Sequence, residues 1–434
     1  MSLDALKQAL EELFDPSFVE GTARLANGIA IALPDGDAAT TDDAIFIKWL
    51  LEHSDDAPFG DKGETKLDKN VRRAKRLVAR GKASVIGFEP SSVLPAIEAA
   101  LSPRCHLDAR LEDVIIYEKG GKFERHKDTP RTTNLVGTLV VGLPVAHEGG
   151  RFTIIDGGKK HVVDWSGKPS HDSVRWVALF SDVDHAVEQV KSGTRVTLVY
   201  SLSRSDRPRS DPARDKKLAK LRGIVGGLTI GKDEPVMIAC THQIVTDGSQ
   251  PQPIDTLRGT DREIAESFIE AGFGVAVRAC IVGDSGDGPE RAFPDTRDLY
   301  AITRLAQSIP AKIAAGMRDV VSFSDVVDME EYAEEGDDDV GGTTLGEYIL
   351  DHVDLDRWVI RKRAAAALIY EGMYSETGYF GNEASIGKIY TLAALEVSAR
   401  RSKPTLTAAK TLTKKPATRP KAKPKQPKAK PKRR

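Results

Sequence analysis

The stretch VRWVALFSDVDHAVEQVKSGTRVTLVYSL, Val174 to Leu202, contains three short segments rich in aliphatic and aromatic residues. They are residues 174–181, 185–190 and 195–202, separated by Asp, Ser and Gly. Apolar segments of this length, bounded by turn residues, indicate β-strands. The turn at residues 191–193 is too short for a crossover helix, so the last two strands should form a hairpin.

Four similar segments precede this stretch, at residues 113–118, 137–144, 150–155 and 160–165. Seven strands in about ninety residues leave no space for helical connections between parallel strands. The sequence therefore predicts antiparallel sheets packed as a sandwich or jelly roll.

Outside this block the pattern is mixed. Ser2 can cap a helix whose Leu3, Leu6, Leu10 and Leu13 share one face, and a second helix is expected from Ser91 or Ser92 to Pro103. Strand-like and helix-like segments alternate between residues 218 and 398, which favours an α+β domain. We expect the following parts: an N-terminal helical and mixed region packing on the core (1–104), the β core (105–203), a linker (204–217), the α+β domain (218–398) and a basic tail (399–434).

Composition narrows the class of protein. The chain has 434 residues, 40% of them hydrophobic, which is ordinary for globular domains. No apolar run reaches the length of a membrane span, and the first residues lack a signal peptide's basic and apolar regions. Three scattered cysteines do not have zinc-site spacing and suggest a reducing compartment. A cytoplasmic location without membrane contact is expected.

The net charge of −1 conceals an uneven distribution. The segment Arg401–Arg434 holds 14 Lys or Arg, six Pro and no acid, which leaves 49 of the 63 basic residues against all 64 acidic ones, or about −15, for the rest. Such a composition cannot bury a core and predicts a disordered tail. A tail of this charge can attract nucleic acid, another polyanion or the chain's own acidic surface.

Four His-x-Asp pairs occur in the chain, so the bare pattern cannot identify a metal site. Two imidazoles and one carboxylate that leave coordination positions open form the ligand set of non-haem iron(II) sites, and such ligands need rigid strands. Only His126 and Asp128 lie at the entrance of the strand-rich block, where alternate residues of an extended chain face the same side. The remaining pairs read as solvated or capping residues: His53/Asp55, His106/Asp108 and His352/Asp354.

A second histidine and an arginine in the stretch quoted first fit the same site. His185 opens the segment 185–190, and Arg195 begins the following strand of the hairpin. A buried arginine beside a metal is costly unless an anion pairs with it, and a dicarboxylic 2-oxo acid would supply that anion. Taken alone, Arg195 would be read as a surface residue of a β-edge.

Tyr117, the run EKGGKF, His126-x-Asp128, GTLVVGLP, HEGGRFTI, WVALFSDVDH and GTRVTLVYSL together resemble the Fe(II)/2-oxoglutarate-dependent dioxygenases, in the prolyl 4-hydroxylase-like branch. The resemblance covers about residues 113–202, with a looser similarity in 57–74 and 379–385. It implies a double-stranded β-helix (jelly-roll) core flanked by helices, to which the segment pattern of residues 218–398 adds the C-terminal α+β domain. It implies iron ligation by His126, Asp128 and His185, binding of the 2-oxoglutarate C5 carboxylate by Arg195, where collagen-type enzymes have lysine, and contacts from Tyr117 and Thr197.

The activity implied by this resemblance is hydroxylation of a C–H bond with release of succinate and CO2. It needs Fe(2+), 2-oxoglutarate and O2, with ascorbate as an additional reductant. A protein or peptide side chain such as proline is the expected substrate. Basic residues near the first metal motif are candidates for contact with an anionic target, although such side chains are more often simply solvated: Lys119, Lys122, Lys127 and Arg131.

Two other functions stay open at this point. A nucleic-acid oxygenase or demethylase would agree with the basic tail, but such enzymes need aromatic residues for base stacking, and aromatics make up only 6% of the chain. The β core could also be a non-catalytic module that binds an anion, which would be favoured if a metal ligand were missing.

Overall fold

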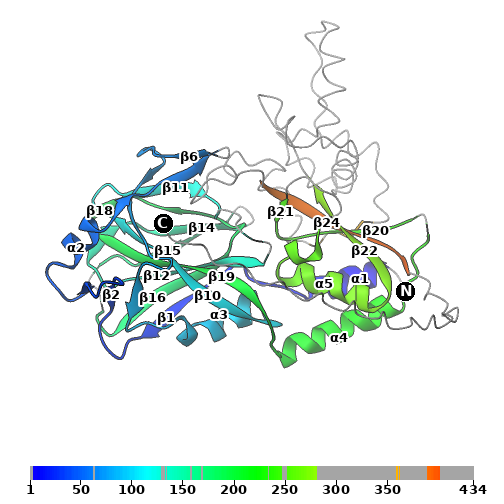
Figure 1. Cartoon of the computed structure of the whole chain (residues 1–434). Coiled ribbons are helices and arrows are strands. Elements are labelled where there is room, and N and C mark those ends of the chain that lie inside the picture. The colour runs from blue at the N-terminus through cyan, green and yellow to red at the C-terminus, as the bar shows by residue number, and fades with distance from the viewer. Residues whose placement is uncertain are drawn as a thin grey trace, which may run out of the picture. The chain divides into compact units, whose positions relative to one another are not determined.

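The computed structural model describes residues 3–61, 64–128, 132, 134–156, 159–167, 170–232, 234–246, 252–280, 358–359, 361 and 389–400. Within these ranges the chain is mostly β with few helices (Figure 1). No helix in these ranges has the length and apolar character needed to cross a membrane. Much of the expected α+β domain, including His352/Asp354, lies outside the described residues, and so does the tail beyond Arg400.

Most strands of the first 208 residues belong to two antiparallel sheets. The larger sheet has the order β1-β16-β12-β19-β10-β8-β4, with bounds Phe18–Arg24, Ser173–Phe180, Leu135–Gly142, Arg195–Pro208, Cys105–Tyr117, Lys75–Val78 and Asp55–Asp56. The smaller sheet has the order β15-β14-β17-β11-β7, with bounds Lys159–Val163, Phe152–Asp156, Asp184–Val187, Lys122–His126 and Arg72–Arg73. Three small sheets complete this part: β13 (His147–Gly149) with β18 (Val190–Gly193), β3 (Ala38–Thr40) with β2 (Ala30–Ala32) and β9 (Ser84–Ile86), and β5 (Phe59–Asp61) with β6 (Glu64–Lys66).

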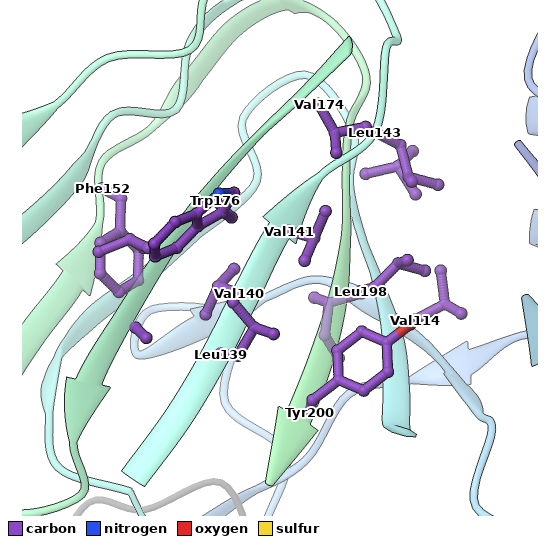
Figure 2. Packing of buried hydrophobic residues seen from close by; sticks show 14 of the residues in the cluster. Val114, Leu139, Val140, Val141, Leu143, Phe152, Val174, Trp176, Leu198 and Tyr200 are labelled. Carbon is purple, nitrogen blue, oxygen red and sulfur yellow. The ribbon is translucent and has the colours of Figure 1, made fainter. Parts of the chain in front are cut away.

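The two faces of the larger sheet carry different side chains, because successive residues of a strand point to opposite sides. One face bears aliphatic residues that share a core with helices α2 (Phe46–Glu52) and α3 (Leu94–Leu101), the second following a short 3-10 turn at Pro90–Ser92. Val114, Leu139, Val141 and Leu198 belong to this core (Figure 2). The other face looks toward the smaller sheet and bears polar residues among apolar ones, including Tyr117, Thr138, Arg195 and Thr197.

A second hydrophobic core contains α1 (Leu3–Glu11), α4 (Pro212–Gly226), α5 (Gly259–Glu270) and a mainly antiparallel sheet. Strand β24 (Ile389–Arg400) lies in the middle of this sheet and pairs with β20 (Val236–Ala239), β21 (Ile244–Thr246) and β22 (Phe273–Cys280), while β23 (Trp358–Val359) runs parallel to β20. A 3-10 turn at Ile254–Thr256 precedes α5. We call these elements the second lobe (Figure 1).

Helices and strands of the structure run across two of the expected boundaries. Residues 204–208, expected in a linker, continue strand β19, and residues 212–217 begin α4. The Asp211 side chain accepts a hydrogen bond from the backbone N–H of Arg214, and Pro212 occupies the first turn, so the polar segment is a helix start rather than a flexible connection. Strand β24 also extends to Arg400, two residues into the segment assigned to the tail.

The N-terminal helix was expected to pack on the β core with the rest of residues 1–104. Its buried residues Leu6, Ala9 and Leu10 instead pack in the second hydrophobic core, against α4. The sequence shows only that one face is apolar, and this face can be buried equally well by either core.

Candidate metal centre

His126 and His185 face each other across two neighbouring strands. His126 is the last residue of β11 and lies directly opposite His185 of β17 in the antiparallel register, with the ring centroids 4.2 Å apart. Asp128 follows two residues later, where its backbone N–H donates to the Ser181 carbonyl oxygen. One ligand atom from each of the three side chains lies within 4.8 Å of the other two, and all three residues are buried. The structure thus brings together the three predicted metal ligands.

Each of the three side chains is oriented by a hydrogen bond on the side away from the common centre. The Nδ1 of His126 lies 2.8 Å from the Glu124 carbonyl oxygen, and the Nδ1 of His185 lies 2.9 Å from that of Val183. These bonds place the proton on Nδ1 and leave the Nε2 lone pair available. The Thr138 hydroxyl donates to Oδ2 of Asp128, and the other oxygen, Oδ1, lies 3.8 Å from His185 Nε2.

The environment of His126 keeps its imidazole neutral. Burial, followed by the nearby His185, lowers the pKa of His126 well below its ordinary value of 6.5. The ring of Phe123 stacks on that of His126 at a centroid distance of 3.5 Å. The ring centroids of Phe152 and His185 are 5.3 Å apart. A neutral imidazole is the form that binds a metal, so His126 needs no deprotonation at neutral pH.

Arg195 begins β19 directly opposite Tyr117 of β10, and its side chain is almost completely buried. Its Nε and Nη2 atoms have no hydrogen-bond partner in the structure. The guanidinium carbon lies 5.4 Å from the ring centroid of Tyr117 and 5.3 Å from that of Trp165. Burial lowers the pKa of Arg195 to about 10, so the group still carries its charge at neutral pH. A buried cation with two unused donors is suited to binding an anion.

The predicted site residues all line one cavity between the two large sheets. His126, Asp128 and His185 contribute to it from the smaller sheet and its continuation, and Arg195, Tyr117 and Thr197 from the larger sheet. Gly150, with φ +65°, lies beside Arg195: a Cβ added there would come within 3.0 Å of the Arg195 Cδ. A side chain at position 150 would therefore crowd the arginine.

The other histidine–aspartate pairs do not join this group. The Nδ1 of His53 lies 2.8 Å from the Trp49 carbonyl oxygen, and that of His106 lies 3.1 Å from a carboxylate oxygen of Glu98. Asp108 pairs with the exposed Arg207. Across the part of the chain that the structure describes, His126, Asp128 and His185 form the only group of three metal-ligand side chains found.

Lys127, between two predicted ligands, has an unexpected position. It was considered as a loop residue facing solvent or an anionic target, but it is 1% exposed and its Nζ donates to Oε1 of Gln243 at 2.8 Å. The backbone N–H of Gln243 donates in turn to Oδ2 of Asp182, which also lies 3.3 Å from the Nδ1 of His242. These bonds join the metal motif to the second lobe, because Gln243 directly precedes β21.

Three further residues of the site were not predicted from the sequence. Thr138 orients Asp128, Phe123 stacks on His126, and Arg72 lines the cavity from β7. Thr138 carries a weak signal, since it lies within the expected strand 137–144. Phe123 carries none, because no strand was expected there and the register shifts between Phe123 and His126. Arg72 is in a charged run of the sequence, where nothing local indicates burial.

Comparisons with known proteins give structural matches only. No family model matches the chain, and no curated protein matches it. Solved structures that align with it include an oxidoreductase of the 2OG-Fe(II) oxygenase family from Burkholderia pseudomallei, at 15% identity over 47% of this chain and 92% of that one, with a TM-score of 0.27. A prolyl-4-hydroxylase from Pseudomonas putida aligns at 14% identity over 46% of this chain and 99% of that one, also with a TM-score of 0.27.

A prolyl hydroxylase from Trichoplax adhaerens, solved with a peptide fragment of the hypoxia inducible factor oxygen degradation domain, aligns at 12% identity. That alignment covers 46% of this chain and 91% of the other, with a TM-score of 0.27. The neighbours named here are thus iron- and 2-oxoglutarate-type oxygenases and prolyl hydroxylases, each similar to less than half of this chain.

Proposed function

We propose that the protein is an Fe(II)- and 2-oxoglutarate-dependent dioxygenase that hydroxylates a C–H bond, on a protein side chain such as proline. The observation that carries the proposal is the pairing of two features in one cavity. A buried group of two imidazoles and one carboxylate faces the same space as a buried arginine with two unused donors. The two facing antiparallel sheets agree with a double-stranded β-helix, the fold that the sequence resemblance implies.

The donor set fits iron(II). Two neutral imidazole nitrogens and one carboxylate form the facial set found in non-haem iron(II) oxygenases, which leaves coordination positions for other ligands. The hydrogen bonds from Nδ1 of both histidines and to Oδ2 of Asp128 fix the ligand orientations before any metal arrives. In this proposal His126, Asp128 and His185 hold the metal.

The unused donors of Arg195 fit the distal carboxylate of 2-oxoglutarate. A planar guanidinium can bind a carboxylate through two parallel hydrogen bonds, and burial strengthens that pairing. Tyr117 and Thr197 line the same part of the cavity, and their hydroxyl groups are suited to the same carboxylate. Apolar side chains such as Val140 and Phe152 form the remaining walls and limit the access of water.

Bound iron and 2-oxoglutarate would supply, together with O2, an oxidative decarboxylation. It gives succinate and CO2 and transfers one oxygen atom to the substrate. In this proposal the chain contributes the three metal ligands, a cation that positions the co-substrate, and a cavity with partly apolar walls.

Succinate formation tests the proposal directly. Purified protein with iron(II), 2-oxoglutarate, O2 and ascorbate should release succinate, and cell lysate should increase the rate. Peptides and nucleosides from the lysate are then searched for the mass gain of one oxygen atom, which separates a protein hydroxylase from a nucleic-acid oxygenase. His185→Ala should abolish succinate release. If the parent protein binds 2-oxoglutarate but never forms succinate, the β core is a binding module and the proposal is wrong.

A further inference from the structure

A groove adjoins the metal cavity on the side of β7. It has a volume of about 310 Å³ and is formed by β4, β8, the segment around β7 and the turn that follows β10. Arg72 lines both the groove and the metal cavity, so the two spaces meet at this side chain. The groove is lined by Asp56, Ala57, Leu67, Asp68, Lys69, Arg72, Arg73, Ala74, Lys75, Ile116, Glu118, Lys119 and Gly121.

Arg72 is a second buried cation of the site. It is 5% exposed, and its Nη1 donates to the Pro58 carbonyl oxygen at 2.7 Å. Its guanidinium carbon lies 4.4 Å from the centroid of the Phe123 ring, whose other neighbour is His126. The Nε of Arg72 is buried and has no hydrogen-bond partner. Arg72 therefore offers an unused donor one aromatic ring away from a predicted metal ligand.

The groove itself carries an excess of positive charge. Its lining contains five basic side chains and three carboxylates, a surplus of two cations. Two of these charges already form an ion pair with each other, since the Nζ of Lys75 lies 2.9 Å from Oδ1 of Asp56. Lys69, Arg73 and Lys119 are exposed, and Leu67 presents an apolar side chain that is 69% exposed. A ligand with carboxylates and some apolar surface would complement this lining.

The lining distinguishes between two kinds of anionic macromolecule. Single-stranded nucleic acid binds where aromatic side chains stack on its bases, and none of the described residues that line the groove is aromatic or a histidine. The carboxylates of Asp68 and Glu118 would also repel a continuous phosphate backbone. A polypeptide can instead place isolated carboxylates opposite the cations and present backbone donors to the carboxylates. These features favour a peptide.

We propose that this groove binds an acidic segment of a polypeptide substrate, one carboxylate of which pairs with Arg72. The proposal rests on the function proposed above, because it places the acidic segment beside the carbon to be hydroxylated. Arg195 is assigned to the co-substrate, so Arg72 supplies a second, separate contact for an anion. An acidic residue near the target carbon would therefore determine which substrates bind.

Peptide binding to the full chain tests this. Two series of short fluorescein-labelled peptides are compared, each with a central proline. In one series the flanking residues are aspartates, and in the other they are asparagines. Their affinity is measured by anisotropy under argon, with iron(II) and 2-oxoglutarate bound. The aspartate series should bind at least about tenfold more tightly, and Arg72→Gln should remove most of that difference while weakening 2-oxoglutarate affinity far less.

Two double variants separate the groove from general charge attraction. Lys69→Gln with Lys119→Gln removes two exposed charges from the groove, whereas Lys414→Gln with Lys415→Gln removes two from the basic tail. The groove variant should weaken binding of the aspartate peptide several-fold, and the tail variant should not. Because both groove positions are exposed, this arm remains informative even if Arg72→Gln fails to fold.

Several results would overturn the proposal. Equal loss in the two double variants would mean that the acidic peptide binds by unspecific attraction. A large loss of 2-oxoglutarate affinity in Arg72→Gln, with peptide affinity kept, would assign Arg72 to the co-substrate. An oligonucleotide that binds in a groove-dependent way, while acidic peptides do not, would favour a nucleic-acid substrate. Succinate release by the parent protein reports separately on the oxygenase function, so peptide selectivity without succinate would contradict that function alone.

Discussion

Arg195 is a guanidinium that folding has removed from water without giving its Nε and Nη2 an acceptor. Leaving such a group unpaired is unfavourable, so an anion that reaches it should bind strongly. We expect Arg195→Ala to weaken 2-oxoglutarate affinity by well over tenfold, since a buried charge-assisted pair contributes about 2–5 kcal/mol. Iron(II) affinity should stay nearly unchanged. Titration calorimetry measures both.

The matched control lies on the same strand. Arg207, near the other end of β19, is exposed and pairs with Asp108. Arg207→Ala should leave 2-oxoglutarate affinity unchanged. Equal 2-oxoglutarate affinity in the Arg195 variant and the parent protein would remove Arg195 from the site.

His126 links the stability of the metal-free protein to pH. Its pKa is lowered by burial and by His185, so the folded state holds it neutral while the unfolded chain takes up a proton below its ordinary value of 6.5. Stability from this residue is therefore present above that pH and is lost as the pH falls toward the lowered folded pKa. We expect the free energy of unfolding to fall by up to about 1.4 kcal/mol per pH unit below the ordinary value.

Urea denaturation of the metal-free protein at several pH values checks this prediction. His126→Asn should reduce the pH dependence. The exposed His171 provides a control, because His171→Asn should keep the slope of the parent protein. An unchanged slope in the His126 variant would show that other groups cause the acid sensitivity.

The sequence could predict that the three proposed metal ligands lie together, because they belong to a local pattern placed among recognisable strands. His126 and Asp128 are two residues apart, and His185 and Arg195 are ten residues apart. The expected hairpin is wrong, because β17 and β19 belong to different sheets, but both residues still reach the cavity between those sheets. Thr138, Lys127 and Arg72 depend on partners that are far away in the chain, such as Asp128 for Thr138 and Gln243 for Lys127. A single sequence contains no record of such distant pairs, which is why these roles emerge only from the structure.

At the scale of the elements, Lys127 joins strand β11 to the second lobe. It lies between the predicted ligands His126 and Asp128. Lys127 reaches Gln243, and Arg258, just before α5, donates from Nε to the Leu135 carbonyl oxygen of β12 at 3.1 Å. Helix α5 and the segment before β21 therefore hold the end of β11 and the start of β12. We infer that this contact holds the segment His126–Asp128 in place.

Gln243→Ala tests this link. It removes the Oε1 acceptor of a buried ammonium group, so the free energy of unfolding should fall by about 1–3 kcal/mol. Iron(II) affinity should fall as well, because the segment that carries Asp128 loses an anchor. Gln243→Glu retains an acceptor oxygen and should retain iron(II) affinity better than the alanine variant. Unchanged stability and unchanged metal affinity in Gln243→Ala would show that the contact has no such role.

The sequence predicted strands correctly where the segments are apolar. It missed elements whose residues are mostly charged or polar. Strands β12, β16 and β19 lie in apolar segments that the sequence identifies directly. Strand β11 (Lys122–His126) is short and mostly polar, and it is formed by its pairing with β17 and β7 rather than by intrinsic preference. The start of α4 was read as a linker because Asp and Pro mark both turns and helix N-termini.

For the whole molecule, the role of the segment beyond Arg400 is predicted from composition alone. Its charge and proline content predict a disordered electrostatic tether without a catalytic role. Truncation at Ser402 should leave uncoupled 2-oxoglutarate turnover intact. Binding of RNA or DNA should weaken steeply with salt in the full chain and be largely lost in the truncated one, because each neutralised phosphate releases counterions.

Titrations at low and moderate salt, with and without the tail, measure this effect. Binding that does not respond to salt would contradict a purely electrostatic tether. Loss of turnover after truncation would show that the tail contributes to the active protein.

The second lobe draws its core from both ends of the described chain, and this affects the order in which the protein can form during synthesis. Helix α1 supplies Leu6 and Leu10, and β24 supplies Leu395 and Val397, to the same cluster. The strands of the two large sheets are all complete once Pro208 has been made, so the sandwich can fold while translation continues. Helix α1 precedes its partners, since α4 begins only at Pro212 and β24 at Ile389, so its cluster is not complete until nearly 400 residues have followed it. A ribosome-bound chaperone would meet the apolar face of α1 before those partners are made, and no single cut between residues 203 and 218 would yield two fragments that each keep a complete core.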